Sequence, residues 1–277
     1  MPQINTNFII LILFILAVLI VYLAVLVAPT RASKEMLEPF IHRFFAHRGL
    51  YTKDQSIPEN SLAAFKAACD AGYGIELDIQ LTADGKVVVA HDTHLFRVTG
   101  AEGSIPDMTY DELSKLRLFG TDQQIPLLWD VLQLVDGKVP LIIEFKSGER
   151  NMDLCREAFM MLEAYDGPYC VESFDPNLVR WFYRYNPRLL RGQLAMPSSH
   201  YNKAEVPALA RFMMSKCLMG RLGRPHFIAY EIGRTPLSVK LAYKIGAAKV
   251  CWVSHNESDA KTNDMVIFEF YEPPISY

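Results

Sequence analysis

Two acidic residues, Glu76 and Asp78, stand in the otherwise apolar run GIELDIQL at residues 74–81. Successive side chains of a β-strand point to opposite faces, so these two carboxylates are expected on one face of a strand. Two carboxylates held close together repel each other and are costly to desolvate unless a proton or a cation lies between them. A hard divalent cation is the simplest occupant. The alternative is a polar strand end that is open to water.

Other polar residues follow other predicted strands. His47 and Arg48 stand in AHRG after an apolar run, and His91 follows VVVA. Glu144 and Lys146 close the run LIIEFK. Taken singly, such residues are as easily a surface histidine, a turn or an ion pair. The functional side chains of a parallel barrel gather at the carboxyl ends of its strands, so together these residues predict one shared site that forms only in a barrel.

The elements that would position these residues are apolar strands that alternate with amphipathic helices. From residue 44 onward, this alternation is typical of βα units around a parallel sheet and predicts an α/β fold, a (β/α)₈ TIM barrel. An open doubly wound sheet is the competitor, but no GxGxxG or Walker-type loop is present to hold a nucleotide. The candidate strands lie at residues 44–49, 74–81 or 86–92, 140–146, 169–174, 189–196, 226–232, 249–255 and 265–272.

The predicted barrel domain covers residues 43–277 and contains one insertion. Residues 93–139 are expected to form a small helical, hairpin-like insertion, in which TYDELSKLRL and PLLWDVLQLV flank a polar turn. Residues 29–42, which mix proline, charged and apolar positions, are expected to be a juxtamembrane connector. The chain is therefore expected to contain one barrel behind a short linker.

Residues 8–28 form an uncharged apolar run, FIILILFILAVLIVYLAVLVA, which predicts a transmembrane helix. At about 1.5 Å per residue the run extends about 30 Å, the thickness of the hydrocarbon core of a bilayer. A cleaved signal peptide is the rival, but the run exceeds the usual apolar region of about 7 to 15 residues and no basic residue precedes it. Arg31, Lys34 and Arg43 follow the run, so the positive-inside rule predicts a single-pass protein whose barrel is cytoplasmic.

The composition excludes several classes of partner. The formal net charge is −3 and the basic residues are spread thinly, so nucleic-acid binding is not expected. No feature of the sequence implies a protein partner. The five cysteines include no CxxC pair and are expected to be reduced core residues, which favours a reducing compartment.

The sequence resembles the glycerophosphodiester phosphodiesterases. The resemblance rests on AHRG (46–49), PENS (58–61), IELDIQLTADGKVVVAHD (75–92), Thr-Gly (99–100) and IEFK (143–146), in that order along the chain. ESFDP (172–176), RGQL (191–194) and the tryptophan-containing strand followed by Asn256 are similar to later segments of that family. The chain departs from the family before its last strand, where TNDM replaces the usual acidic-glycine approach, and this departure concerns the final turn more than the chemistry.

The resemblance implies a TIM-barrel enzyme that uses a divalent cation to cleave a glycerophosphodiester into sn-glycerol 3-phosphate and an alcohol. It implies that Glu76, Asp78 and Glu144 ligate Ca²⁺ or Mg²⁺. It also implies that His47 and His91 act as acid and base, in either order, because an imidazole gains or loses a proton near neutral pH.

The resemblance also suggests substrate-binding residues. Arg48 and Lys146 are expected to donate to the phosphoryl oxygens, Arg48 with the better fork geometry. Phe174 and Trp252 are expected either to line a glycerol pocket or to pack in the core.

Two other functions stay open at this point. The protein could be a membrane-anchored lysophospholipase D. In that case an apolar insertion would hold the mouth of the barrel near a lipid surface through Leu127, Leu128 and Trp129. That insertion could equally pack on the barrel. A non-catalytic tethered barrel is the second alternative, although none of the matched acidic and histidine positions is missing.

Overall fold

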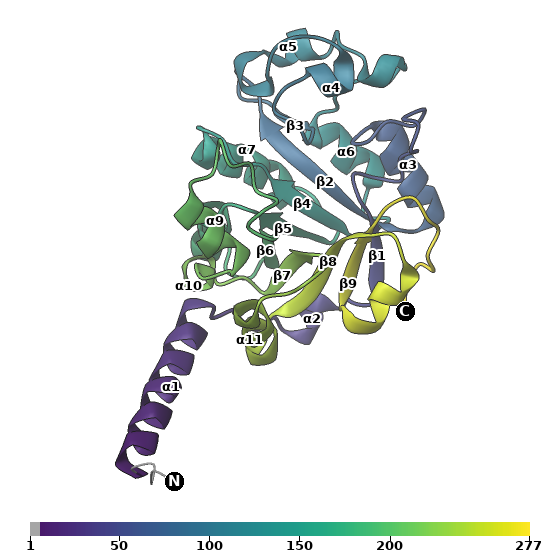
Figure 1. Ribbon diagram of the computed structural model, residues 1–277. Coiled ribbons are helices and arrows are strands. Elements are labelled where there is room, and N and C mark those ends of the chain that lie inside the picture. Colours follow the sequence, from purple (N-terminus) through teal and green to yellow (C-terminus); the bar gives the residue numbers. More distant parts are fainter. Residues whose placement is uncertain (1–5) are drawn as a thin grey trace.

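The computed structural model describes residues 6–277, which fold as a closed eight-stranded parallel barrel with one apolar helix at the N-terminal end (Figure 1). Neighbouring strands pair in the order β1-β9-β8-β7-β6-β5-β4-β2, and β1 also pairs with β2, which closes the sheet. The predicted barrel is thus confirmed. Its strands are β1 (Arg43–Ala46), β2 (Gly74–Leu81), β4 (Leu141–Phe145), β5 (Tyr169–Ser173), β6 (Arg191–Ala195), β7 (Phe227–Glu231), β8 (Ala248–Ser254) and β9 (Met265–Phe268).

One predicted strand lies outside the barrel. The second barrel strand was predicted at residues 74–81 or 86–92, and each of these segments contains a β-strand. The first, β2, belongs to the barrel, whereas β3 (Val87–Val89) pairs antiparallel with the end of β2. The turn between them contains Gly85 at φ +78°, a left-handed conformation that glycine adopts readily. His91 therefore follows a hairpin strand and not a barrel strand.

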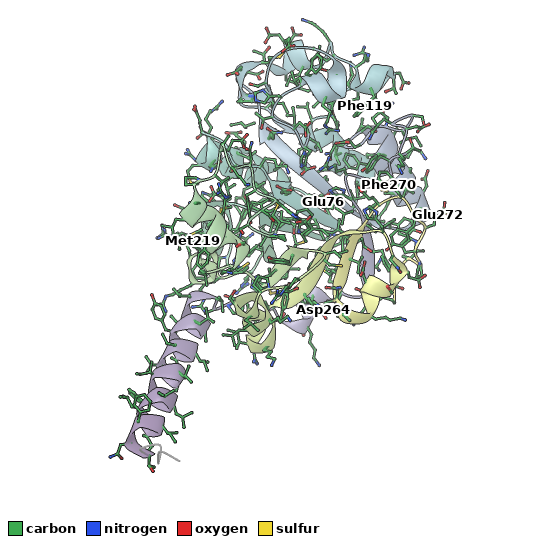
Figure 2. The ribbon with its side chains drawn as sticks, viewed as in Figure 1. Glu76, Phe119, Met219, Asp264, Phe270 and Glu272 are labelled. Carbon is green, nitrogen blue, oxygen red and sulfur yellow. The ribbon has the colours of Figure 1, made fainter. Side chains whose placement is uncertain are left out.

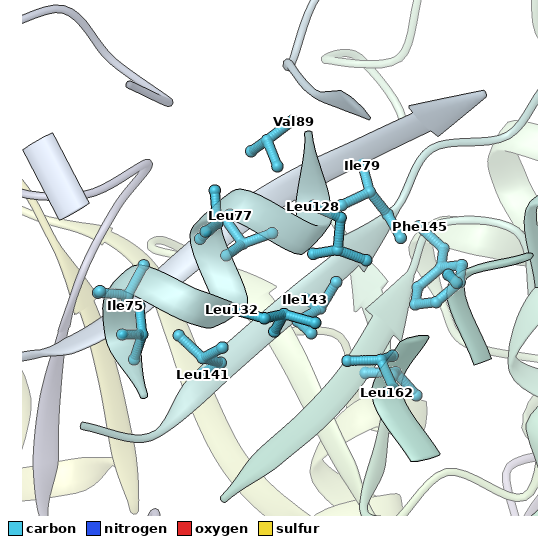
Figure 3. Close-up of a cluster of buried hydrophobic side chains, with 14 of the residues drawn as sticks. Ile75, Leu77, Ile79, Val89, Leu128, Leu132, Leu141, Ile143, Phe145 and Leu162 are labelled. Carbon is cyan, nitrogen blue, oxygen red and sulfur yellow. The ribbon is translucent and has the colours of Figure 1, made fainter. Parts of the chain in front are cut away.

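Helices cover the outer face of the barrel, and β2 shows how the two faces divide. Figure 3 shows Ile75, Leu77 and Ile79 of β2 among apolar side chains of neighbouring strands and helices. Because strand side chains alternate, the even-numbered residues of β2 point to the opposite, inner face. The helices are α3 (Leu62–Ala71), α6 (Leu128–Val135), α7 (Asn151–Glu163), α8 (Pro176–Tyr185), α9 (Ala208–Ser215), α10 (Gly220–Gly223), α11 (Leu237–Ile245) and η3 (Glu257–Thr262).

The expected helical hairpin at residues 93–139 is wrong in its details. The segment forms short pieces, α4 (Phe96–Thr99), η1 (Ile105–Asp107), α5 (Tyr110–Leu113) and η2 (Leu118–Gly120), before α6. TYDELSKLRL supplies only the four residues of α5. PLLWDVLQLV supplies α6, whose apolar face, including Leu128, is buried against the sheet, so this helix covers the barrel instead of extending from it. Figure 1 shows α4 and α5 on the side of the barrel opposite to α1.

Residues 29–42 pack against the barrel. They include α2 (Lys34–Leu37), whose N-cap Ser33 accepts a hydrogen bond from the Met36 N–H at 3.3 Å. Phe40 is buried, and its ring stacks on that of Phe45 inside the barrel at a centroid distance of 6.4 Å. The apolar cluster that surrounds Phe40 includes the first residues of several strands, such as Phe227 and Met265. The segment therefore closes the amino-terminal end of the barrel.

We expect Phe40→Ala to destabilise the barrel by about 3 to 5 kcal/mol, because it leaves a cavity in this closed end. Urea unfolding of the detergent-solubilised chain, followed by tryptophan fluorescence, measures the loss. Phe96→Ala is the matched control, since Phe96 is 63% exposed and its removal should cost less than about 0.5 kcal/mol. Equal stability of the two variants would mean that residues 29–42 act only as a loose connector.

The helix α1 (Thr6–Leu26) has no buried residue and leaves the barrel beside α10 and α11 (Figure 1). Among the described residues it is the one helix that is long and apolar enough to cross a membrane, a test that a signal sequence also passes. At its base Val27 is buried, and Gly220 lets the two backbones approach, because a Cβ at Gly220 would lie 3.0 Å from the Val27 carbonyl.

Candidate active site

Three carboxylates meet on the inner face of the barrel. Glu76 and Asp78 come from β2, and Glu144 lies beside Asp78 on the neighbouring strand β4. All three side chains are buried, and one carboxylate oxygen of each lies within 4.8 Å of the others. Figure 2 labels Glu76 near the centre of the barrel. The pair lies within its strand and not at the strand's end, because β2 continues to Leu81 to form the hairpin with β3.

Asp78 is neutralised by cations. Lys146 Nζ lies 2.8 Å from Asp78 Oδ1 and 2.9 Å from Glu144 Oε1. Arg48 Nε lies 3.6 Å from Asp78 Oδ2, and the Asn60 amide donates to the same oxygen at 2.8 Å. Burial opposes ionisation of Asp78, but Lys146, His91 and Arg48 outweigh it and hold the pKa of Asp78 well below its usual range. These contacts favour the ionised form of Asp78.

Glu76 lacks such a partner. It accepts a hydrogen bond from the backbone N–H of Arg48 at 3.0 Å, and His47 Nε2 lies 4.0 Å from Glu76 Oε2. Burial, followed by the negative charges of Asp78, Glu144 and Glu172, raises the pKa of Glu76 well above its usual value. Burial is also the main cause that raises the pKa of Glu144.

Glu172 adds a fourth carboxylate that sequence reasoning did not single out. It lies beside Glu144 on β5, and its buried Oε2 has no hydrogen-bond partner within residues 6–277. Burial, together with the charges of Glu144 and Asp78, raises its pKa well above the usual value. Four crowded carboxylates with Lys146 and Arg48 as their nearest cations fit an additional divalent cation, since hard cations prefer oxygen ligands.

His47 follows β1 and is oriented by a residue from the other end of the chain. Its Nδ1 lies 2.9 Å from Glu269 Oε2, and the same oxygen accepts a hydrogen bond from Tyr51 Oη at 2.7 Å. An ionised carboxylate only accepts hydrogen bonds, so Nδ1 carries the proton and Nε2 is left as an acceptor. Burial lowers the pKa of His47, although the hydrogen bond to Glu269 opposes this shift.

His91 belongs to a second chain of polar contacts. Its Nδ1 lies 2.7 Å from Asp92 Oδ1, and Asp92 in turn pairs with Arg97. The guanidinium of Arg97 donates to both oxygens of Glu59, which also accepts from Arg48 Nη1 at 2.7 Å. Sequence reasoning noted Glu59 only as part of PENS. Its acidic type within that motif was the available signal.

A cavity of about 320 Å³ opens above these residues. One wall is polar and the other apolar. Phe174 and Trp252 stand on the apolar wall with their rings edge to face, 5.7 Å between centroids, and Trp252 Nε1 donates to the Ala229 carbonyl at 3.1 Å. The lining residues are His47, Arg48, Glu76, His91, Glu144, Glu172, Phe174, Leu194, Met196, Trp252, Val253 and Ile267.

Two of the predicted residues do not line this cavity. Asp78 lies beneath it, covered by its ion pairs, and Lys146 lines an adjoining cavity of about 390 Å³ together with Gln80, Thr93 and Arg150. The structure thus brings all nine predicted side chains together, seven of them around one pocket. The arrangement offers a cation site, two imidazoles and an apolar wall to one small anionic molecule.

Comparisons with known proteins identify the family of this chain. The profile described as the glycerophosphoryl diester phosphodiesterase family matches residues 47–268. The chain is 45% identical over 111 residues to a glycerophosphodiester phosphodiesterase of Caldanaerobacter subterraneus, which covers 37% of this chain and 44% of that protein. It is 34% identical over 131 residues to the rat lysophospholipase D GDPD1, covering 43% of this chain and 40% of that protein. The chain thus matches less than half the length of each.

Solved structures share the fold. A phosphodiesterase from Oleispira antarctica, in complex with the product sn-glycerol-3-phosphate, superposes with a TM-score of 0.66 at 20% identity. The superposition covers 82% of this chain and 93% of that one, so the barrel is shared as a whole. Because the family profile extends across the barrel and includes His47, His91 and the four clustered carboxylates, this chain belongs to the glycerophosphoryl diester phosphodiesterase family.

Proposed function

We propose that the protein hydrolyses glycerophosphodiesters to sn-glycerol 3-phosphate and an alcohol. The observation that carries this proposal is the cluster of Glu76, Asp78 and Glu144 between two imidazoles at one mouth of the barrel. Family membership supports it, and so does the product complex of the Oleispira relative. An apolar wall opposite the carboxylates suits the carbon atoms of a glycerol unit.

The proposed cofactor is Ca²⁺ or Mg²⁺, held by Glu76, Asp78 and Glu144, with Glu172 close enough to add charge. When bound, such an ion would offset the negative charge of the phosphodiester and polarise its non-bridging oxygens. Arg48 and Lys146 are proposed to donate to phosphoryl oxygens. The Nε of Arg48 is buried without a hydrogen-bond partner among the described residues, which leaves it available for this role.

The two histidines are proposed to divide the proton transfers. His47 is the base in our assignment, because its lowered pKa keeps the imidazole neutral and Glu269 leaves Nε2 free to accept a proton. His47 takes the proton of the substrate's own 2-hydroxyl while that oxygen forms a bond to phosphorus. His91 gives a proton to the oxygen of the leaving alcohol while the bond between that oxygen and phosphorus breaks. Water then opens the cyclic phosphate with the two roles reversed.

A panel of substrates tests this proposal. The detergent-solubilised chain is incubated with glycerophosphocholine, glycerophosphoethanolamine, glycerophosphoglycerol or lysophosphatidylcholine, each with Ca²⁺, Mg²⁺ or a chelator. Release of glycerol 3-phosphate that requires the cation supports the proposal. Full activity in chelator would reject the cation site as drawn.

A second candidate is a lysophospholipase D that acts on lysophospholipids. The exposed apolar helix α1 favours it, because we propose that α1 spans a membrane and holds a cytoplasmic barrel near lipid. The similarity to the rat lysophospholipase D is a further support. The predicted contact of Leu127, Leu128 and Trp129 with lipid is not part of this proposal, since Leu128 is buried and α6 covers the barrel. Release of choline from lysophosphatidylcholine, with lysophosphatidic acid as the other product, distinguishes this activity.

We expect Glu269→Gln to lower kcat by about 10- to 100-fold with little change in KM, because it loosens the orientation of His47 without touching the pocket. The pH profile of kcat/KM provides the specific readout, since loss of the carboxylate changes the environment in which His47 titrates. Glu205→Gln, in an exposed loop, is the control. An unchanged pH profile would contradict a positioning role for Glu269.

A further inference from the structure

A second groove lies where α1 meets the barrel, and we call it the α1 groove. Its volume is about 620 Å³, and it is separate from the catalytic pocket because the two share no lining residue. Figure 1 shows α1, α10 and α11 meeting on this side of the barrel. The lining residues are Leu23, Phe212, Lys216, Leu218, Arg234, Thr235, Pro236, Leu237, Ser238 and Lys240.

The α1 groove carries positive charge that the protein itself does not neutralise. Within residues 6–277, Lys216, Arg234 and Lys240 make no ion pair, and their side chains donate no hydrogen bond to the protein. Lys216 Nζ lies 4.9 Å from the centroid of the Phe212 ring. Arg48 and Lys146 of the candidate active site, in contrast, are paired with carboxylates. The groove is therefore suited to an anion that comes from outside the chain.

Exposed apolar side chains lie beside these cations. Leu237 is 81% exposed and Phe212 is 50% exposed. Leu209, which is 71% exposed, precedes Phe212 by three residues on α9, so the two side chains share one face of that helix. A surface that combines exposed leucine and phenylalanine with lysine and arginine is typical of proteins that rest on the interface of a bilayer.

The position of Leu23 identifies the occupant. Leu23 lies in the last turns of α1 and also lines the α1 groove. The 21 residues of α1 extend about 30 Å, so if α1 spans the hydrocarbon core, its last turn lies at the level of the lipid headgroups. The groove must then lie at that same level. This step rests on the membrane-spanning role of α1 that forms part of the proposed function.

We propose that the α1 groove binds the phosphate headgroup of an anionic phospholipid, while Phe212 and Leu237 enter the acyl layer beside it. This contact would also orient the barrel. The loop between β7 and α11 begins at Ile232, whose N–H donates to the Trp252 carbonyl at 2.9 Å, so the groove and the apolar wall of the catalytic pocket share one loop. Lipid bound in the groove thus holds the rim of the catalytic pocket against the bilayer surface.

The test measures binding of fluorescent phosphatidylglycerol and phosphatidylcholine to the full chain in neutral detergent. We expect phosphatidylglycerol to bind at least tenfold more tightly than phosphatidylcholine. The variant K216E/R234E/K240E should lose this preference, because each basic residue near a lipid surface contributes to attraction of the headgroup. The matched control K86E/K138E/K261E reverses three exposed lysines elsewhere on the barrel and should keep the preference.

Turnover of glycerophosphocholine in detergent is measured in parallel, since none of the three reversed residues lines the catalytic pocket. Normal turnover by K216E/R234E/K240E shows that the variant is folded. If the wild type lacks diesterase activity but shows the charge-dependent lipid preference, the proposed lipid site is supported and the proposed activity is rejected. Equal binding of the two lipids by the wild type, or an unchanged preference in K216E/R234E/K240E, would overturn the proposal. The proposal would also be overturned if the chain formed a dimer in detergent and Leu237→Asp converted that dimer to a monomer without loss of lipid binding.

Discussion

Glu76→Gln is expected to abolish turnover and yet to stabilise the cation-free protein. The substitution removes one proposed ligand, and loss of that ligand should lower kcat/KM by about 10³-fold or more. In the cation-free state Glu76 is buried without a cationic partner, and its neighbours repel it. A neutral amide of the same shape still accepts the hydrogen bond from the Arg48 N–H and carries no charge to desolvate.

The sign of the stability effect follows from the raised pKa of Glu76. A carboxyl whose pKa is raised in the folded state binds protons more tightly there than in the unfolded state. Its contribution to stability is present below the unfolded value of about 4.5 and is lost as pH rises through the folded pKa. At pH 7 in chelator, Glu76→Gln should therefore raise the free energy of unfolding by about 1 kcal/mol or more.

Asp78→Asn is the matched control, because it removes a carboxylate of the same cluster with the opposite effect on stability. Asp78 pairs with Lys146 and lies near Arg48, so its neutralisation leaves buried cations less well compensated. We expect the variant to be inactive and less stable by about 3 kcal/mol. Thermal unfolding in chelator and with added Ca²⁺ or Mg²⁺ measures both effects. The cation should raise the midpoint of the wild type and of neither variant. A stabilised Asp78→Asn, or a cation-stabilised Glu76→Gln, would contradict this account.

The sequence allowed the barrel to be predicted because its signals are local. Apolar strands and amphipathic helices alternate along the chain, and this alternation is enough to indicate parallel βα units. The hairpin of β2 and β3 was harder to predict, since an apolar run of three or four residues looks alike inside and outside a barrel. TYDELSKLRL has helical period but forms only one turn, since the length of a short helix depends on tertiary packing more than on period.

The residues of the candidate site also differ in how far the sequence alone could predict them. Alternation along β2 was sufficient to place Glu76 and Asp78 on one face, and the carboxyl-end rule was sufficient to bring His47 and Glu144 near them. Glu269 was missed because its contact with His47 depends on pairing of the last strand with the first, across more than two hundred residues. The roles of these residues in turnover stay predictions.

The two histidines differ in their expected response to the leaving group, and this difference tests their assignment. An alkoxide leaving group such as that of choline needs a proton as its bond to phosphorus breaks, whereas p-nitrophenolate does not. His91→Ala should therefore lose about 10²- to 10⁴-fold in kcat on glycerophosphocholine but much less on glycerophospho-p-nitrophenol. His47→Ala should lose about as much on both, because each reaction needs the base.

This assignment rests on the surroundings of the two rings. His47 is the more deeply buried imidazole, and its lowered pKa favours the neutral form that accepts a proton. The His91 side chain is 35% exposed, so it can exchange protons with water between the two steps. His200→Ala, at a 51% exposed position outside the pocket, is the control. If His47→Ala were the variant rescued by the better leaving group, the roles of acid and base would be exchanged while the residues of the site stayed the same.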